Sequence, residues 1–173
     1  MNKSPHIVTG KGAAVRVRPV RAEDAEPLTR LTLAAFVPIF ESFRQMLGPA
    51  VCNLVWPDWR AGQQRAIETF CRERERYECW VAELGGEPAG LVATQVDPEQ
   101  HTAEVQSLVV DPACQNLGIG TALNAFALER MKERCVRLAR VETGGDASHA
   151  PARRSYEKAG YVAMPLVRYF KDL

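Results

Sequence analysis

The alternation of apolar and polar residues changes its period several times along this 173-residue chain, and each change predicts a new element. Residues 15–20 alternate apolar with basic side chains, which is typical of a half-buried strand. From Asp24 onward, apolar residues recur at spacings of three and four, which predicts a helix. Prolines and a Gly-Pro pair interrupt the aromatic-rich residues 36–58, where we expect one or two short helices. Another helix is expected from Trp59.

After Tyr77 the pattern changes to the period of strands. Two apolar runs, 79–84 and 89–96, flank a Gly-Gly pair and predict a β-hairpin, and a third strand is expected over about 102–110. The remaining pattern predicts, in order, a helix from Gly118 to about 134, a strand over 138–143, a helix over 151–159 and final strands at 161–164 and 166–170.

This order predicts a single α/β domain with a mixed, mostly antiparallel sheet of about six to seven strands, flanked by four or five helices. We expect residues 1–13 to form a flexible leader and residues 14–173 to form the domain. The order lacks the regular βα alternation of a dinucleotide-binding fold. No Gly-Lys-Ser/Thr sequence follows Gly120, so the chain has no P-loop either.

Composition excludes several classes of function. A formal net charge of +1 provides no basic field for nucleic acid or an anionic membrane. No apolar run approaches the ~20 residues of a membrane-spanning helix, and the first nine residues lack the apolar core of a secretion signal, so we expect a cytoplasmic protein. The five cysteines form no Cys-x-x-Cys pair, and we expect neither a disulfide framework nor a metal site.

The stretch from Gln115 to Thr121 joins an apolar strand to the start of a helix, and it holds Gly118 and Gly120. Such a turn leaves several main-chain N–H groups free at the positive end of the helix dipole. A phosphate or pyrophosphate suits that position, and glycine lets the backbone approach the anion closely. Tight packing of a strand-to-helix turn is the alternative explanation for the two glycines.

With these elements in place, the chain resembles the GNAT superfamily of N-acetyltransferases, loosely over 15–35 and closely over 79–170. Two signatures carry the resemblance. The first, Q/R-x-x-G-x-G/A, is met by Gln115, Gly118 and Gly120; the second, Asn-x-x-Ala-x-x-x-Tyr-Glu-x-x-Gly-Phe/Tyr, is met from its alanine onward by Ala152, Tyr156, Glu157, Gly160 and Tyr161.

The resemblance implies that the chain binds acetyl-CoA and transfers the acetyl group to an amine. The helices of about 24–77 would then lie on the acceptor side and residues 79–170 would form the cofactor-binding core. Backbone groups of Leu108, Val109 and Val110 would pair with the pantetheine arm. The pyrophosphate would lie on the N–H groups of Gln115, Asn116, Leu117, Gly118, Ile119, Gly120 and Thr121, with Ala152 and Tyr156 also beside the cofactor.

Two positions depart from the family pattern. Position 117, frequently basic in the family, is Leu117, so one phosphate contact is missing. Position 149, often Asn in the family, is His149, which could hydrogen-bond the cofactor or a nearby carbonyl, or could be an exposed loop residue.

For the chemistry, the resemblance makes Tyr156 the general acid for the departing thiolate. Proton transfer from a phenol at pKa ~10 to a thiolate near ~8.5 is uphill by only about 2 kcal/mol. Packing beneath the cofactor is the alternative role for this tyrosine. The N–H of Leu108 would polarise the thioester carbonyl.

An alkyl amine is mostly protonated at neutral pH, so the reaction needs a base or a site that lowers the pKa of the amine. We expect Glu104 to be the base, since strand alternation would place Glu104, Gln106 and Leu108 on one face. Glu104 lies about 13 Å along the strand from Leu108, so its contact with the amine would need a water or a long substrate. A solvated carboxylate is the alternative, and Glu142 is the second candidate.

The acceptor is the part that the sequence determines least. Phe36, Phe40 and Glu41 fall where the family builds its acceptor wall, although aromatic residues at helical spacing are more often core. We expect an enzyme that acetylates a small-molecule primary amine, without nucleic acid or membrane partners. A protein or peptide amine acceptor and a non-catalytic acyl-CoA-binding module are the alternatives, and a homodimer is an arrangement that the sequence allows.

Overall fold

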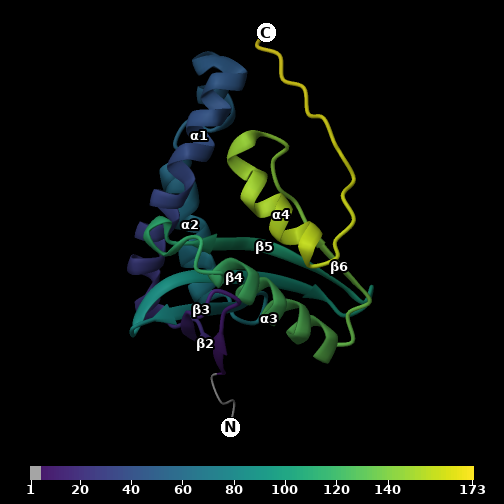
Figure 1. The fold of residues 1–173 in the computed structure, drawn as a ribbon. Coiled ribbons are helices and arrows are strands. Elements are labelled where there is room, and N and C mark those ends of the chain that lie inside the picture. Colours follow the sequence, from purple (N-terminus) through teal and green to yellow (C-terminus); the bar gives the residue numbers. More distant parts are fainter. Residues whose placement is uncertain (1–4) are drawn as a thin grey trace.

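The structure is a computed structural model that describes residues 5–173. Its six-stranded sheet has the order β1-β2-β3-β4-β5-β6, so each strand lies beside its neighbour in sequence. All pairs are antiparallel except β5 with β6, which is parallel (Figure 1). The elements are β1 His6–Val8, β2 Ala14–Pro19, η1 Ala22–Asp24, α1 Ala25–Val55, α2 Trp59–Arg72, β3 Glu78–Leu84, β4 Glu87–Asp97, β5 Thr102–Val110, η2 Pro112–Cys114, α3 Ile119–Glu133, β6 Leu138–Val141, η3 Ala147–His149 and α4 Ala150–Lys158.

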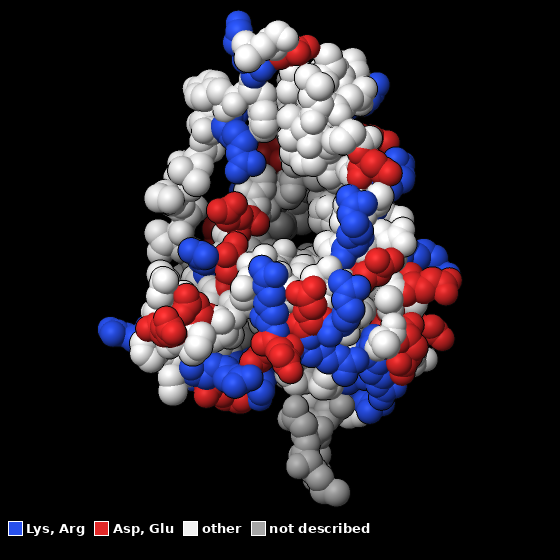
Figure 2. Space-filling view, turned by 180° about the vertical axis from the view of Figure 1, so that it is seen from behind, with Lys and Arg blue, Asp and Glu red and all other residues white. Residues whose placement is uncertain are grey.

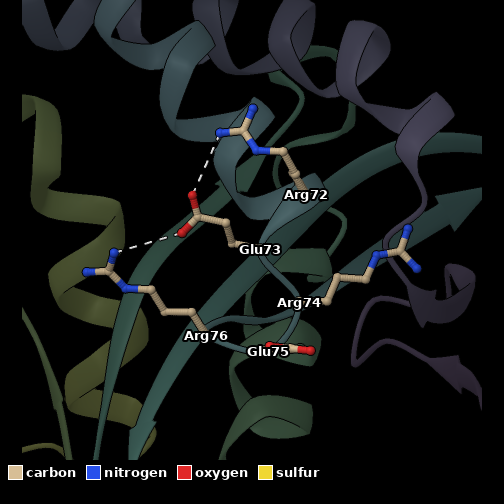
Figure 3. Close-up of a pocket in the computed structure, with 5 residues that line it drawn as sticks. All are labelled: Arg72, Glu73, Arg74, Glu75 and Arg76. Carbon is tan, nitrogen blue, oxygen red and sulfur yellow. Dashed lines mark ion pairs between the residues drawn. The ribbon is translucent and has the colours of Figure 1, made fainter.

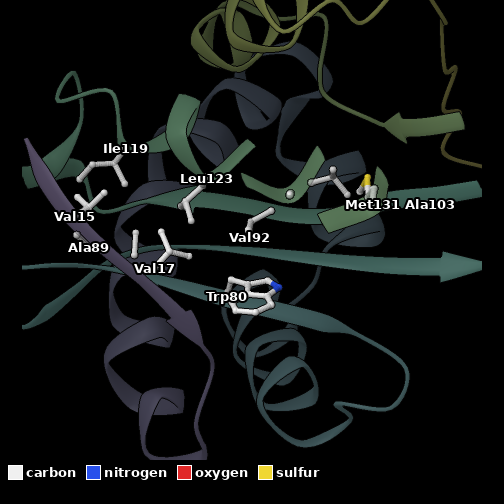
Figure 4. Close-up of a cluster of buried hydrophobic side chains, with 12 residues drawn as sticks. Val15, Val17, Trp80, Ala89, Val92, Ala103, Ile119, Leu123 and Met131 are labelled. Carbon is white, nitrogen blue, oxygen red and sulfur yellow. The ribbon is translucent and has the colours of Figure 1, made fainter. Parts of the chain in front are cut away.

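The two faces of the sheet are covered by different helices. α3 packs on one face, where its Ile119, Leu123 and Met131 join side chains of β2, β3, β4 and β5 (Figure 4). α1 and α2 pack on the other face, where Leu28 and Ile67 join apolar residues of β3 and β4. The expected α/β class, the central hairpin and the helix after the glycine turn are therefore confirmed.

A buried ion triad connects the first strand of this core to the start of α1. The guanidinium of Arg18 donates to both carboxylate oxygens of Asp24, at 2.6 and 2.7 Å, and to Glu83 of β3 at 2.6 Å. Burial acts to raise the pKa of Asp24, but the hydrogen bonds from Arg18 and the Arg21 backbone hold it below its ordinary value. The charges are thus paired, as buried charges need to be.

The acceptor-side helices differ from the expected short pieces. α1 runs from Ala25 to Val55, and Pro38 lies inside it, as does Pro49. The only non-helical backbone in this span is at Gly48, whose φ is 75°. Pro38 therefore does not interrupt the helix, whereas the break expected at the Gly48-Pro49 pair is present and separates a long first part from a short second part.

The expected flexible leader is wrong for the part that the structure describes. Residues 6–8 form β1, which pairs with β2, and the Thr9 side chain is 5% exposed. The prediction failed because the turn between β1 and β2 packs against a segment that is distant in the sequence. A local sequence pattern does not reveal such a contact. Residues 1–4 of the predicted leader lie outside the described residues.

The two expected C-terminal strands are also absent from the structure, which describes all of residues 161–173 as non-repetitive chain. Gly160, with a φ of 91°, ends α4 as predicted. The segment then runs past α4 toward the C-terminal end of α1 (Figure 1). Its apolar side chains are mostly exposed, and Phe170 contacts Trp56 with 6.2 Å between ring centroids. The local pattern predicted strands, but in the structure this segment has no partner strand among the described residues.

Candidate functional site

The edge of β5 that faces β6 is paired over only part of its length. β6 pairs with β5 from Thr102 to Val105 and ends at Val141. In residues 5–173 no other strand takes its place beside the rest of β5. The two strands therefore part, and β5 has an open edge from Ser107 to Val110.

A β-bulge in β5 lies at the point where the strands part. Ser107 pairs with Ala93 and Val105 pairs with Thr94, so Gln106 is the extra residue. Bulges shift the alternation of side chains by one position. Leu108 and Val110 consequently pack on the α3 side of the sheet, together with Ala103 and Val105.

This bulge corrects one prediction. Glu104, which lies between two residues that face α3, points to the opposite face of the sheet from Leu108. The expectation that Glu104 and Leu108 share a face is therefore wrong, because simple alternation does not anticipate an extra residue.

Main-chain donors point into the open edge. The N–H of Asp111 donates to the carbonyl of Ala89 on β4, at 2.9 Å. Because hydrogen-bonding groups alternate along a strand, the N–H groups of Leu108 and Val110 point away from β4 and toward the opening. Those of Val109 point toward β4, so the expectation that Val109 also pairs with the pantetheine arm is wrong. The carbonyl of Val110 faces the same way and accepts from the Gln115 side chain at 3.5 Å.

The turn that follows β5 presents a second set of donors. Among the described residues, none of the N–H groups from Asn116 to Thr121 donates to a protein acceptor. Asn116 and Gly118 have left-handed backbones, with φ of 63° and 81°, and Gly118 is the N-cap of α3. Consecutive free N–H groups at a helix N-terminus form a cradle for an anion.

The two glycines of this turn serve different purposes. Gly118 is required by its positive φ, which other residues adopt at a cost. Gly120 has ordinary helical backbone, and a Cβ there would lie 3.4 Å from Val110 and 3.6 Å from Leu108. The cradle is therefore directly beside the open edge of β5.

Tyr156 lies on α4 with its side chain buried at 8% exposure. Burial, together with the neighbouring Tyr161, raises the pKa of Tyr156 to about 12. The two rings meet edge to face with 5.6 Å between centroids. The phenol therefore keeps its proton at neutral pH and is available as a hydrogen-bond donor.

His149 is held by a carboxylate that the sequence analysis did not single out. Its Nδ1 lies 2.6 Å from Oδ1 of Asp146, and its ring stacks on Phe43 of α1. Asp146 also accepts hydrogen bonds from Ser148 and from Ser42, the latter at 2.9 Å. With Nδ1 engaged, Nε2 is the ring nitrogen left for a ligand. The Asp-x-x-His spacing is the only signal in the sequence that could have revealed this pair.

The remaining candidate carboxylates have less specific surroundings. Glu104 accepts from Nε and another nitrogen of Arg140 on β6, at 3.0 and 2.9 Å. Glu142 is exposed in the segment after β6. This ion pair connects β5 to β6 in the half of β5 where the two strands pair. The role of Glu104 as a base stays a prediction.

The expected acceptor wall is an aromatic cluster. Phe40 is its buried centre, stacked on Trp59 at 4.3 Å between centroids. Phe36 packs on the core beneath α1, whereas Glu41 is exposed. Phe43 connects the cluster to His149. Seen from behind, the molecule has a hollow above the sheet, between the α1 side and the C-terminal segment (Figure 2).

A separate depression lies in the connection between α2 and β3, far from the glycine turn in the sequence. Five charged residues line it (Figure 3). Glu73 pairs with Arg72 and Arg76 at 3.7 and 3.9 Å, and the exposure of these side chains makes this an ion-pair network in contact with solvent. Residues 5–173 hold no group of three or more potential metal ligands and no helix that is long and apolar enough to cross a membrane.

Residues 48–161, well over half of the chain, match the acetyltransferase (GNAT) family. The chain belongs to this family. A GNAT-family protein from Desulfovibrio desulfuricans superposes on this acetyltransferase domain with a TM-score of 0.68 and 24% identity, over 88% of this chain and 87% of the other. The PaiA N-acetyltransferase of Thermoplasma acidophilum, solved with coenzyme A, gives 0.63 and 17%, over 87% and 91%. These likenesses establish the GNAT fold.

The GNAT chain also matches segments of curated relatives. It is 35% identical over 87 residues to the mycothiol acetyltransferase of Sanguibacter keddieii, which covers 47% of this chain and 27% of the relative. It is 40% identical over 78 residues to that of Acidothermus cellulolyticus, covering 44% and 23%. The match thus spans about a quarter of each of these relatives.

Proposed function

We propose that this GNAT protein transfers the acetyl group of acetyl-CoA to a primary amine of a small molecule, by direct attack of the amine. Family membership supports an acyltransferase. The observation that carries the specific proposal is the combination of the free N–H groups from Asn116 to Thr121 with the open edge of β5 beside them.

The residues present fit the donor. A diphosphate would lie on the N–H groups of the cradle, since they have no acceptor of their own. The N–H and carbonyl groups of Leu108 and Val110 would pair with the amide-bearing arm, in the way that an added strand pairs with a sheet edge. Acetyl-CoA would supply the activated acetyl group.

The proton steps fall to the chain's own residues and to the acceptor. The N–H of Leu108 would stabilise negative charge that develops on the thioester oxygen. Tyr156 would donate to the departing sulfur as the general acid. Because burial raises the pKa of Tyr156 to about 12, its contribution is largest as a strong hydrogen bond that forms while charge develops on sulfur. Glu104 is the base that we predict for the amine, reached through water or a long substrate.

Two features support a small acceptor. The aromatic cluster around Phe40 and Phe43 offers an apolar wall next to His149. Relatives that match this chain are named mycothiol acetyltransferases, and that name refers to a small-molecule acceptor. The match covers only about a quarter of their length.

Isothermal titration with acetyl-CoA tests the proposal. We expect saturable binding with a one-to-one ratio, and a chain that binds no acetyl-CoA at millimolar concentration would contradict the proposal. A panel of polyamines, amino acids, amino sugars and lysine peptides then tests the acceptor. Turnover confined to the peptides would contradict a small-molecule acceptor.

A further inference from the structure

The turn between β1 and β2 is attached to the glycine turn by one side chain. The hydroxyl of Thr9 donates to the carbonyl of Leu117, at 2.6 Å, across a sequence separation of 108 residues. The same oxygen accepts from the N–H groups of Ala13 and Lys11, at 3.1 and 3.4 Å. Thr9 is buried, so this contact fixes the β1–β2 turn on the surface beside α3.

The attached turn brings Lys11 to Gly118, the N-cap of α3. A Cβ on Gly118 would lie 3.2 Å from Cβ of Thr9 and 3.7 Å from Cγ of Lys11. Beyond Cγ, the flexible stem of lysine carries the ammonium group, and Gly118 itself belongs to the run of free N–H groups that forms the cradle. Lys11 is exposed, and among residues 5–173 no carboxylate forms an ion pair with it.

The glycine turn itself contributes no positive side chain. No residue from Gln115 to Thr121 is basic. Leu117 occupies the middle of the turn, and its side chain packs against the hydrophobic core, so it cannot face a phosphate. A diphosphate carries two negative charges, and main-chain dipoles alone would neutralise them incompletely.

We propose that Lys11, presented by the β1–β2 turn, binds the diphosphate of the CoA donor and supplies the positive charge that the glycine turn lacks. Thr9 is the positioning residue for this contact. The proposal rests on the proposed function, because it assigns a residue to the donor site of that same reaction. It joins the N-terminal hairpin, outside the segment that matches the family, to the cofactor site.

Titration of CoA into the purified full chain and its Lys11→Ala variant tests the contact. We expect Lys11→Ala to weaken CoA binding by about tenfold, as is usual for loss of a hydrogen bond to a charged group. Binding by the variant should also depend less on salt concentration. Lys132→Ala is the matched control, since it removes one charge from the opposite end of α3, where Lys132 pairs with Glu129.

Two further arms identify the phosphate and the role of Thr9. Dephospho-CoA lacks the 3′-phosphate but keeps the diphosphate, so the same fold loss is expected with it. Thr9→Val should weaken CoA binding as well, and Lys11→Ala should then add little, whereas Thr9→Ser should behave as the wild type. Thermal unfolding of each variant verifies that the fold is retained.

The outcomes separate this inference from the proposed function. Wild-type protein that fails to bind CoA overturns both. Wild-type protein that binds CoA, with Lys11→Ala losing no more affinity than Lys132→Ala, overturns the role of Lys11 alone. A loss seen with CoA and absent with dephospho-CoA would overturn the assignment to the diphosphate.

Discussion

The two halves of β5 are both extended strand, but they have different neighbours in the sheet. From Thr102 to Val105, β5 lies between β4 and β6, and the Glu104–Arg140 pair ties it to β6. From Ser107 to Val110 it pairs only with β4, and its other edge is open. The bulge at Gln106 separates the two halves. One strand is thus paired on both edges at one end and leaves main-chain groups free on one edge at the other, where we propose that the donor binds.

The difference arises after β6. The chain leaves β6 at Val141, and the segment that follows is attached to α1, because Asp146 accepts a hydrogen bond from Ser42 of α1. Arg153 also donates to the carbonyls of Gly144 and Asp146, the latter at 2.7 Å. These contacts hold the segment after β6 against α1 and α4, away from the open half of β5.

The largest expected effect comes from separating β4 from the open half of β5. Gly90 pairs with Val110, and a Cβ there would lie 2.7 Å from the carbonyl oxygen of Val109. Gly90→Val should lower the free energy of unfolding by about 3 kcal/mol, because the larger side chain overlaps β5 and separates this half from β4, the strand with which it pairs. Urea unfolding measures the loss, with Gly62→Ala, at an open position in α2, as the control. Wild-type stability in Gly90→Val would show that this pairing does not hold the open half.

The next effect concerns Asp146, which attaches the segment after β6 to α1. Burial acts to raise the pKa of Asp146, but hydrogen bonds from Ser148 and Ser42 and the contact with His149 hold it well below its ordinary value of 3.8. Asp146→Asn should cost about 2 kcal/mol at neutral pH, as expected for hydrogen bonds to a buried charge.

The pH dependence has a defined sign. Because the folded-state pKa is lowered, the contribution of Asp146 is complete above about pH 4 and is lost as the pH falls toward the folded-state value. The stability difference between wild type and Asp146→Asn should therefore shrink below pH 4. Glu99→Gln, at an exposed turn, is the control. A difference that is equal at pH 3 and pH 6 would contradict this account.

A smaller effect tests whether the open half is where the chemistry takes place. Tyr156→Phe should lower kcat by about tenfold, equivalent to roughly 1.4 kcal/mol, because the donor to the departing sulfur is removed. The affinity for acetyl-CoA should barely change, since the buried ring remains. Tyr169→Phe, whose side chain is 89% exposed, is the control. Unchanged turnover would remove Tyr156 from the mechanism.

The smallest effect on stability is expected in the paired half. Glu104→Gln and Arg140→Gln each break the same partly exposed ion pair and should cost less than about 1 kcal/mol. The two variants separate structure from chemistry, since only Glu104→Gln removes the predicted base. We expect a shifted pH–rate profile in Glu104→Gln alone, and identical profiles in both variants would assign the base elsewhere.

Local sequence signals predicted the paired parts of this fold well. The Gly85-Gly86 hairpin, the span of β5 and the helix after Gly118 follow from periodicity and turn residues, which act over a few positions. The features that the sequence did not predict depend on distant contacts. The bulge at Gln106 is set by pairing with β4, and the first hairpin is fixed through Thr9 to a residue 108 positions away.

The candidate site likewise contains features that the local sequence predicted and features that depend on distant contacts. Gly118 could be placed in the turn before α3 from the local sequence, because this strand-to-helix turn needs a left-handed residue there. The hydrogen bond from Ser42 to Asp146 could not, since it joins residues 104 positions apart, and the Asp146–His149 pair had only its local spacing as a signal. The C-terminal strands were expected from alternation, but alternation does not specify an edge with which to pair.

Amide hydrogen exchange, followed by NMR with and without coenzyme A, tests the central claim most directly. We predict that CoA slows exchange at least tenfold at Leu108, Val110 and the N–H groups from Asn116 to Thr121, while Thr102–Val105 remain unchanged. Protection that is absent from the open half and the cradle in the presence of bound CoA would contradict the claim that the donor lies where β5 and β6 part.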